Sequence, residues 1–170
     1  AVAWAKSKVG YQVGSGECVA LTKAYYEYLG VASVKGNGCD YAWNTCPCGW
    51  QRIPYYSGFV AQPGDIAVWT YLTTNYGHVA IGLSADANGI NVVDQGRSYN
   101  YKCHSGKFSY AKGTFYGVIR PDFDSKPPVI SNVQITSLNK KGYHITCTAT
   151  DNTSISTVKF ETYTSDGLVD

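Results

Sequence analysis

The segment Pro121-Asp-Phe-Asp-Ser-Lys-Pro-Pro128 imposes the strongest constraint on how this chain folds. Proline fixes φ and lacks a backbone N–H, so the segment continues neither a helix nor a strand. It therefore separates the 170 residues into two parts. We expect a first module at residues 1–122, a short stiff linker at residues 123–128 and a second module at residues 129–170.

The first module places helical patterns before strand patterns. A short helix is predicted within residues 1–9, and an amphipathic helix over residues 18–29 that ends at Gly30. A loop rich in glycine, cysteine, proline and tyrosine covers residues 36–58. Turn signals then separate four predicted strands, at residues 65–72, 78–84, 90–95 and 113–120. Helices grouped ahead of a largely antiparallel sheet predict an α+β fold.

The second module alternates apolar and polar residues, as half-buried strands do. Three strands are predicted, at residues 129–136, 143–150 and 158–164. Three strands are too few to bury a core of their own. The module looks like the opening half of an all-β immunoglobulin-like sandwich, truncated at Asp170.

The composition excludes several classes of partner. The formal net charge is +2 and no basic run occurs, so we expect no nucleic-acid partner. No apolar run approaches the roughly 20 residues of a membrane-spanning helix, so we expect no membrane span. Six cysteines fit an oxidising, extracellular setting, and the absence of methionine indicates a mature or excised piece of a longer chain.

The turn Gly14-Ser-Gly-Glu-Cys18 places a cysteine at the start of the predicted helix. Unpaired backbone N–H groups in a first helical turn carry partial positive charge, and they favour a thiolate over a thiol. From its position alone, Cys18 fits a small buried residue or half of a disulfide equally well. The other residues of the chain have to distinguish these roles.

A cysteine nucleophile needs a base and a third group that orients the base. Of the three histidines, His144 lies on a strand of the second module and His104 lies in a polar loop, whereas His78 begins a strand directly after Gly77. His78 is therefore the candidate base. The antiparallel strands bring His78 and Asp94 to the same rim, and the two share a face if the register is even. A carboxylate that accepts the imidazole Nδ1–H would hold the ring in place.

Four segments occur in order along the first module: Gly16-Glu-Cys-Val-Ala-Leu21, Gln62-Pro-Gly-Asp-Ile-Ala-Val-Trp69, Gly77-His-Val-Ala-Ile-Gly82 and Val92-Val-Asp-Gln95. Together they resemble the CHAP domains, which are cysteine, histidine-dependent amidohydrolases and peptidases of bacterial and phage cell-wall lysis. The resemblance covers residues 1–122. It implies a papain-like α+β fold in which N-terminal helices pack on an antiparallel β-sheet.

The resemblance also implies the roles of the site residues: Cys18 is the nucleophile, His78 the base and Asp94 the orienting acid. The sequence departs from the family at two positions, because many relatives carry Asn where Gly96 stands and Gln where Glu17 stands. A carboxylate facing the site would oppose both the thiolate and an oxyanion, so we expect Glu17 to point away. The backbone N–H of Cys18 is then one oxyanion donor.

Further contacts to the oxyanion or the substrate are expected among Gln12, Glu17, Trp69, Tyr76 and Gln95. The amide of Gln12 would supply a donor, and Tyr76 lies near the proposed rim, where it would stack on a sugar or a peptide. Trp69, on a predicted strand, is more typical of a core residue.

The remaining cysteines form a loose cluster. Cys39, Cys46 and Cys48 do not match the paired spacing of zinc ligands, so one or two disulfides among Cys39, Cys46, Cys48 and Cys103 are the preferred interpretation. Cys147 would pair with a residue outside the sequence. We expect no cofactor; some relatives hold calcium in an acidic loop, and no matching loop is visible here.

The predicted function is that of a peptidoglycan hydrolase that cleaves a cell-wall amide by cysteine nucleophilic catalysis. An N-acetylmuramoyl-L-alanine amidase is favoured over an endopeptidase of the stem or cross-bridge. Two alternatives stay open: a γ-D-glutamyl stem-peptide endopeptidase, and a non-catalytic cell-wall-binding or adhesin module. We expect a monomer whose partner is peptidoglycan, secreted or cell-wall associated, of bacterial or prophage origin.

Overall fold

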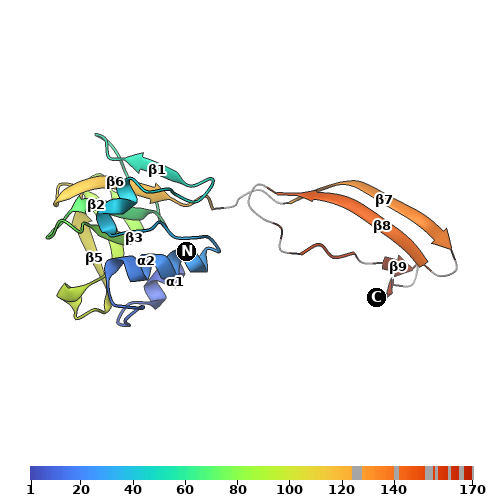
Figure 1. Ribbon diagram of the computed structural model, residues 1–170, viewed down its shortest axis with the longest axis horizontal. Helices are drawn as coiled ribbons and strands as arrows, with labels where there is room; N and C mark the ends of the chain where they lie inside the picture. The colour runs from blue at the N-terminus through green and yellow to red at the C-terminus, as the bar shows by residue number, and fades with distance from the viewer. Residues whose placement is uncertain are drawn as a thin grey trace. The chain divides into compact units, whose positions relative to one another are not determined.

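The computed structural model describes residues 1–123, 128–139, 142–151, 155, 157–160, 162–164 and 167–169. The chain divides into two units, Ala1–Asp122 and Phe123–Asp170 (Figure 1). Residues 124–127 of the expected linker lie outside the described residues.

The first unit is mostly β-sheet with few helices. Its helical elements are α1 (Val2–Ser7), α2 (Cys18–Tyr28) and the 3-10 helices η1 (Gly38–Ala42) and η2 (Arg97–Tyr99). Its strands are β1 (Gln51–Pro54), β2 (Ile66–Tyr71), β3 (His78–Asp86), β4 (Gly89–Gln95), β5 (Cys103–Ser109) and β6 (Thr114–Arg120). They form one antiparallel sheet in the order β1-β6-β2-β3-β4-β5.

Four strands of this sheet match the predicted ones, and two were missed. β1 lies inside the segment that we expected to be a loop, and β5 includes His104, which we also placed in a loop. In β5 only Cys103 and Phe108 are buried, so the strand does not show the alternating apolar pattern that reveals most half-buried strands.

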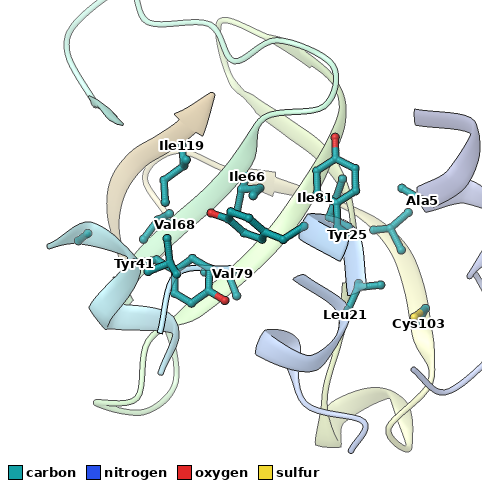
Figure 2. Packing of buried hydrophobic residues seen from close by; sticks show 14 residues of the cluster. Ala5, Leu21, Tyr25, Tyr41, Ile66, Val68, Val79, Ile81, Cys103 and Ile119 are labelled. Carbon is teal, nitrogen blue, oxygen red and sulfur yellow. The ribbon is translucent and has the colours of Figure 1, made fainter. Parts of the chain in front are cut away.

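One face of the sheet is covered by α2. Leu21 and Tyr25 on the helix pack with Ile66, Val79 and Ile81 on the sheet in one buried cluster (Figure 2). These helix residues belong to the apolar stripe that the i, i+3, i+4 spacing predicts. The Tyr25 hydroxyl donates a hydrogen bond to the Gly64 carbonyl at 3.0 Å, which ties the helix to the turn before β2. The N-terminus of α2 is therefore fixed relative to the sheet.

The opposite face of the sheet has its own buried cluster, in which Trp69 packs against Phe108 and Phe115. Successive residues of β2 point to opposite faces, so Ile66 and Val68 join the helix-side cluster while Ala67 and Trp69 join this one. Because both of its faces are buried, β2 has a continuous run of apolar residues in the sequence.

A buried ion pair joins β2 to β6. Asp65, which is fully buried, accepts hydrogen bonds from Arg120 Nε at 2.9 Å and Nη2 at 2.8 Å. Its Oδ2 also accepts from the Gln62 backbone N–H at 2.7 Å, which closes the turn before the strand. The Pro-Gly-Asp sequence of the second family segment is thus a structural turn that fixes one end of the central strands.

The described residues of the second unit form two small antiparallel sheets. β7 (Val129–Asn139) pairs with β8 (Gly142–Thr150), and β9 (Thr162–Thr164) pairs with β10 (Gly167–Val169). The first two predicted strands correspond to β7 and β8. Of the third, the described residues 158–160 are not in a strand and only Thr162–Thr164 is. None of the residues of this unit whose exposure is described is buried, and the immunoglobulin-like assignment stays a prediction.

The expected disulfides are not formed, because all six cysteines are free thiols. The Cys103 thiol is buried and lies 3.2 Å from Gln95 Oε1, to which it donates. Cys46 Sγ accepts a hydrogen bond from Arg52 Nη2 at 3.1 Å, and Cys39 Sγ lies 3.9 Å from Asp40 Oδ1. These sulfurs contact different polar partners instead of one another, and Cys48 is exposed. The prediction of a stapled loop was wrong.

Candidate active site

Cys18 is the first residue of α2, and its partly exposed thiol lines a cleft of about 480 Å³. Glu17 is the N-cap in an extended conformation, and its side chain makes no capping hydrogen bond. The first backbone N–H groups of a helix have no intrahelical acceptor. Those of Cys18 and Val19, which both line the cleft, are therefore suited to bind a negatively charged oxygen.

His78 is held by a close approach of two backbones. Gly77 has φ of +68°, and a Cβ on it would lie 2.5 Å from the Cys39 backbone nitrogen. A Cβ on Gly38 would lie 2.7 Å from the His78 backbone nitrogen. Only glycine therefore fits at either position, and η1 packs directly against the start of β3. This contact fixes the point from which the imidazole extends.

The structure brings His78 and Asp94 together. His78 Nε2 lies 3.1 Å from Asp94 Oδ2, and the side chains are 14% and 1% exposed. β3 pairs with β4 so that Ile81 faces Val93, and the two even-numbered residues consequently point to the same face. The ring nitrogen that meets the carboxylate is Nε2, so the expectation of Nδ1 was wrong. Nδ1 takes no part in this contact.

The Cys18 thiol lines the same cleft as His78 and interacts with its imidazole. Burial alone lowers the pKa of His78. The hydrogen bond to Asp94, the charge of that carboxylate and the interaction with Cys18 outweigh burial, and they raise the pKa of His78 from 6.5 to about 9. At neutral pH the ring is therefore protonated, as a thiolate–imidazolium pair requires.

Two basic residues on the walls of the cleft, Arg97 and Lys112, were not named in the sequence analysis. The Lys112 Nζ lies 4.3 Å from the centroid of the Phe108 ring, which in turn is 6.1 Å from the His78 ring. Arg97 follows β4 and Lys112 precedes β6, so the rule that placed His78 and Asp94 at a strand rim would also have found them.

Comparison with known proteins assigns the first unit. The CHAP domain matches residues 6–96, which is more than half of the chain. The chain belongs to the CHAP family. No protein with a curated description matches it.

Solved structures show that the CHAP domain shares its fold with wall-lysis proteins. The crystal structure of the wild-type endolysin LysIME-EF1 superposes with a TM-score of 0.62 at 21% identity, over 73% of this chain and 63% of that one. The crystal structure of Ly7917 gives 0.51 at 18% identity, over 79% and 64%. Ly7917 with the hydrolyzing product of MDP gives 0.55 at 20% identity, over 79% and 65%. The chain thus spans just under two thirds of the length of these proteins.

The further predicted contacts fall into different places in the CHAP domain. Tyr76 is 70% exposed and lines the cleft. Trp69 is fully buried, with its ring 5.9 Å from that of His78, so its prediction as a substrate contact was wrong. Gln12 is not among the residues that line the cleft, and its amide donates to the Gly14 carbonyl at 3.2 Å. Glu17 does line the cleft, so the expectation that it points away is not confirmed.

Gln95 holds the loop that precedes Cys18, and its side chain has no N–H left for an oxyanion. Its Oε1 accepts from the Val13 backbone N–H at 2.7 Å, and its Nε2 donates to the carbonyls of Val13 at 2.9 Å and Glu17 at 3.1 Å. The side chain is fully buried. Gln95 lines the cleft, but both N–H groups of its side chain are already bound, so the structure does not support this side chain as an oxyanion donor. Its hydrogen bonds hold the loop before Cys18 from the residue next to Asp94.

Replacing Gln95 with leucine is expected to lower the free energy of unfolding by about 3 kcal/mol, because backbone groups of Val13 and Glu17 lose their partners. A displaced Cys18 should also lower kcat/KM by about 10²-fold at temperatures where the variant stays folded. Chemical denaturation and the rate of Cys18 alkylation by iodoacetamide measure the two effects. Gln51→Leu, at an exposed position of β1, is the matched control and should change neither.

One oxygen of the Asp94 carboxylate has no partner among the described residues. Asp94 Oδ1 is buried and accepts no hydrogen bond within the described residues. Gly96, where many relatives carry Asn, has φ of 163°, and a Cβ there would meet nothing within 4 Å. The glycine is therefore not required by space or by backbone conformation.

Within the described residues, no helix has the length and apolar character needed to cross a membrane. Those same residues contain no cluster of three or more His, Cys, Asp or Glu side chains that could hold a metal ion.

Proposed function

We propose that the CHAP domain hydrolyses an amide bond of peptidoglycan, with Cys18 as the nucleophile. The observation that carries the proposal is the grouping of Cys18, His78 and Asp94 in one open cleft, with His78 Nε2 3.1 Å from Asp94 Oδ2. The family match and the shared fold of an endolysin support the substrate class.

The reaction starts with the transfer of the Cys18 proton to His78, or from an existing thiolate–imidazolium pair. The sulfur attacks the carbonyl carbon, and the C=O π electrons move to the oxygen, which accepts a hydrogen bond from the Cys18 backbone N–H. The intermediate collapses to a thioester as the C–N bond breaks and the leaving amine takes the proton from His78. Water then gives a proton to His78 and attacks the thioester, which releases the acid and restores the thiol.

Asp94 orients the base in this scheme. Its carboxylate accepts the Nε2–H of His78, so the other ring nitrogen faces the thiol. The same negative charge stabilises the imidazolium that forms when the thiol loses its proton. All steps use groups of this chain, and we propose that the reaction needs no cofactor.

The N-acetylmuramoyl–L-alanine amide is the proposed scissile bond. Ly7917 was solved with the hydrolyzing product of MDP, or muramyl dipeptide, a ligand without a cross-bridge, and this supports cleavage close to the sugar. A γ-D-glutamyl endopeptidase is the enzymatic alternative. We further propose that the enzyme acts as a monomer outside the cell or at the cell wall.

Mass spectrometry of fragments from digested, purified sacculi tests the choice of bond. The amidase is expected to release stem peptides with a free L-alanine amino group, and to leave muramic acid with an unsubstituted carboxylate. The γ-D-glutamyl endopeptidase would instead leave L-Ala–D-Glu on the sugar. Fragments of that second kind as the main product would contradict the amidase assignment.

A non-catalytic wall-binding module is the second candidate, because Glu17 lines the cleft and Gly96 replaces the usual Asn. Selective alkylation of Cys18 by iodoacetamide at mildly acidic pH distinguishes the two, since an ordinary thiol is mostly protonated there. Fast alkylation of Cys18 would support the catalytic role. A Cys18 no more reactive than the exposed Cys48 favours the binding module.

A further inference from the structure

A second hollow, of about 560 Å³, lies in the first unit and shares none of its described lining residues with the catalytic cleft. The two segments that form it are 32–35 and 43–47, with lining residues Ala32, Ser33, Lys35, Trp43, Asn44, Thr45, Cys46 and Pro47. Trp43 is 66% exposed. A large indole exposed beside a hollow marks a surface suited to a ligand.

The walls of the hollow are held by hydrogen bonds that bridge its segments. Asn44 Nδ2 donates to the Lys35 carbonyl at 2.9 Å, which joins the two segments. Arg52 on β1 donates from Nε to the Tyr41 carbonyl at 3.1 Å, and from Nη2 to the Asn44 carbonyl and to Cys46 Sγ. A site formed before its ligand arrives loses less conformational entropy on binding.

The indole of Trp43 is itself oriented. Its ring meets the edge of the Tyr116 ring at 5.3 Å and 73°, so one aromatic partner fixes the plane while most of the ring stays open. The hollow therefore offers a fixed aromatic face rather than a mobile side chain.

The chemistry around this face fits a sugar ring. A pyranose presents C–H groups on one face, which pack on an aromatic ring, and hydroxyl or acetamido groups at its edge. Ser33 and Thr45 supply hydroxyls, and Asn44 keeps its carbonyl oxygen and one N–H for a ligand. None of the described lining residues is acidic, and Lys35 is the cation among them.

We propose that this hollow is a glycan-binding site, which holds a sugar of the glycan strand whose stem peptide is cut in the cleft. The choice of glycan rests on the proposed function. The 3-10 helix η1 links the two places, because Gly38 lines the cleft and Trp43 follows the last residue of η1. At about 2 Å of rise per residue the five residues span about 10 Å, a distance that one polymer molecule can bridge.

Binding of N,N′,N″-triacetylchitotriose to the full chain, followed by NMR shifts and calorimetry, tests the site. The parent is expected to bind at millimolar or lower concentrations, and Trp43→Ala to bind about tenfold more weakly. Tyr56→Ala removes an aromatic ring of similar exposure, 60%, outside the hollow and should bind as the parent does. No binding by the parent, or equal binding by Trp43→Ala, would overturn the proposal.

Two further measurements separate this site from the catalytic proposal. Trp43→Ala should digest sacculi several-fold more slowly and cleave soluble muramyl dipeptide at the parental rate, because a small substrate does not reach the hollow. Thr45→Arg places a large side chain in the hollow from an exposed position, and it should change the two activities in the same way as Trp43→Ala. It replaces Trp43→Ala in the test if that variant fails to fold. If the chain binds the trisaccharide through Trp43 but does not digest sacculi, the glycan-binding site is supported and the proposed hydrolase activity is contradicted. Equal loss on both substrates would argue against the site.

Discussion

Replacing Cys18 with alanine is expected to lower kcat/KM for the digestion of purified sacculi by about 10⁴-fold or more. The sulfur is the nucleophile of the proposed reaction, and its loss leaves His78 and Asp94 with no group to activate. Release of soluble amino groups from sacculi over time measures the effect. Because Cys18 is partly exposed and is free, the shorter side chain should leave the fold intact.

Cys48→Ala is the matched control for this prediction, since Cys48 is an exposed free thiol outside the cleft. It should digest sacculi at the parental rate. Thermal unfolding of both variants checks that the fold is kept. A Cys18→Ala variant that digests sacculi as fast as the parent would remove the proposed mechanism altogether.

The parts of this site that sequence could predict are those set by local rules. The glycines before Cys18 and the apolar stripe after it determine a turn followed by a helix, and α2 begins at Cys18. The turn before Gly89 determines a hairpin, so β3 and β4 bring His78 and Asp94 to one rim. The register of β3 and β4 could not be predicted, because a shift of one residue turns each side chain to the other face. The packing of apolar side chains on both faces of the sheet determines this register.

The parts that sequence could not predict depend on contacts between residues far apart in the chain. Gln95 and Val13 are 82 positions apart, and no periodicity indicates that an amide on β4 satisfies the backbone of the nucleophile loop. β5 was missed because its exposed positions are polar on both faces. Hydrogen bonds from Arg52 hold the segment that contains Cys46. From the spacing of the cysteines, we had expected a disulfide to hold this segment.

Replacing Asp94 with asparagine is expected to lower kcat/KM by about 10²–10⁴-fold and to change its pH dependence. In the parent, the imidazolium of His78 is the acid for the leaving amine, so activity should fall as the pH rises through about 9. Without the carboxylate, the pKa of His78 returns toward 6.5 and the falling limb moves to lower pH. The kcat/KM profile between pH 5 and pH 10 on a soluble muropeptide measures both effects.

Stability gives an independent readout of the same ion pair. A pKa raised in the folded state stabilises the fold fully below the unfolded value of 6.5, and the contribution is lost as the pH rises through about 9. The shift corresponds to about 3 kcal/mol at the acidic end of this range. The free energy of unfolding of the parent should therefore fall between pH 6 and pH 9.5 more steeply than that of Asp94→Asn. Asp86→Asn, which changes an exposed aspartate paired with Lys107, should retain the parental pH profile of activity. An Asp94→Asn variant with the parental falling limb would show that this carboxylate does not set the protonation of His78.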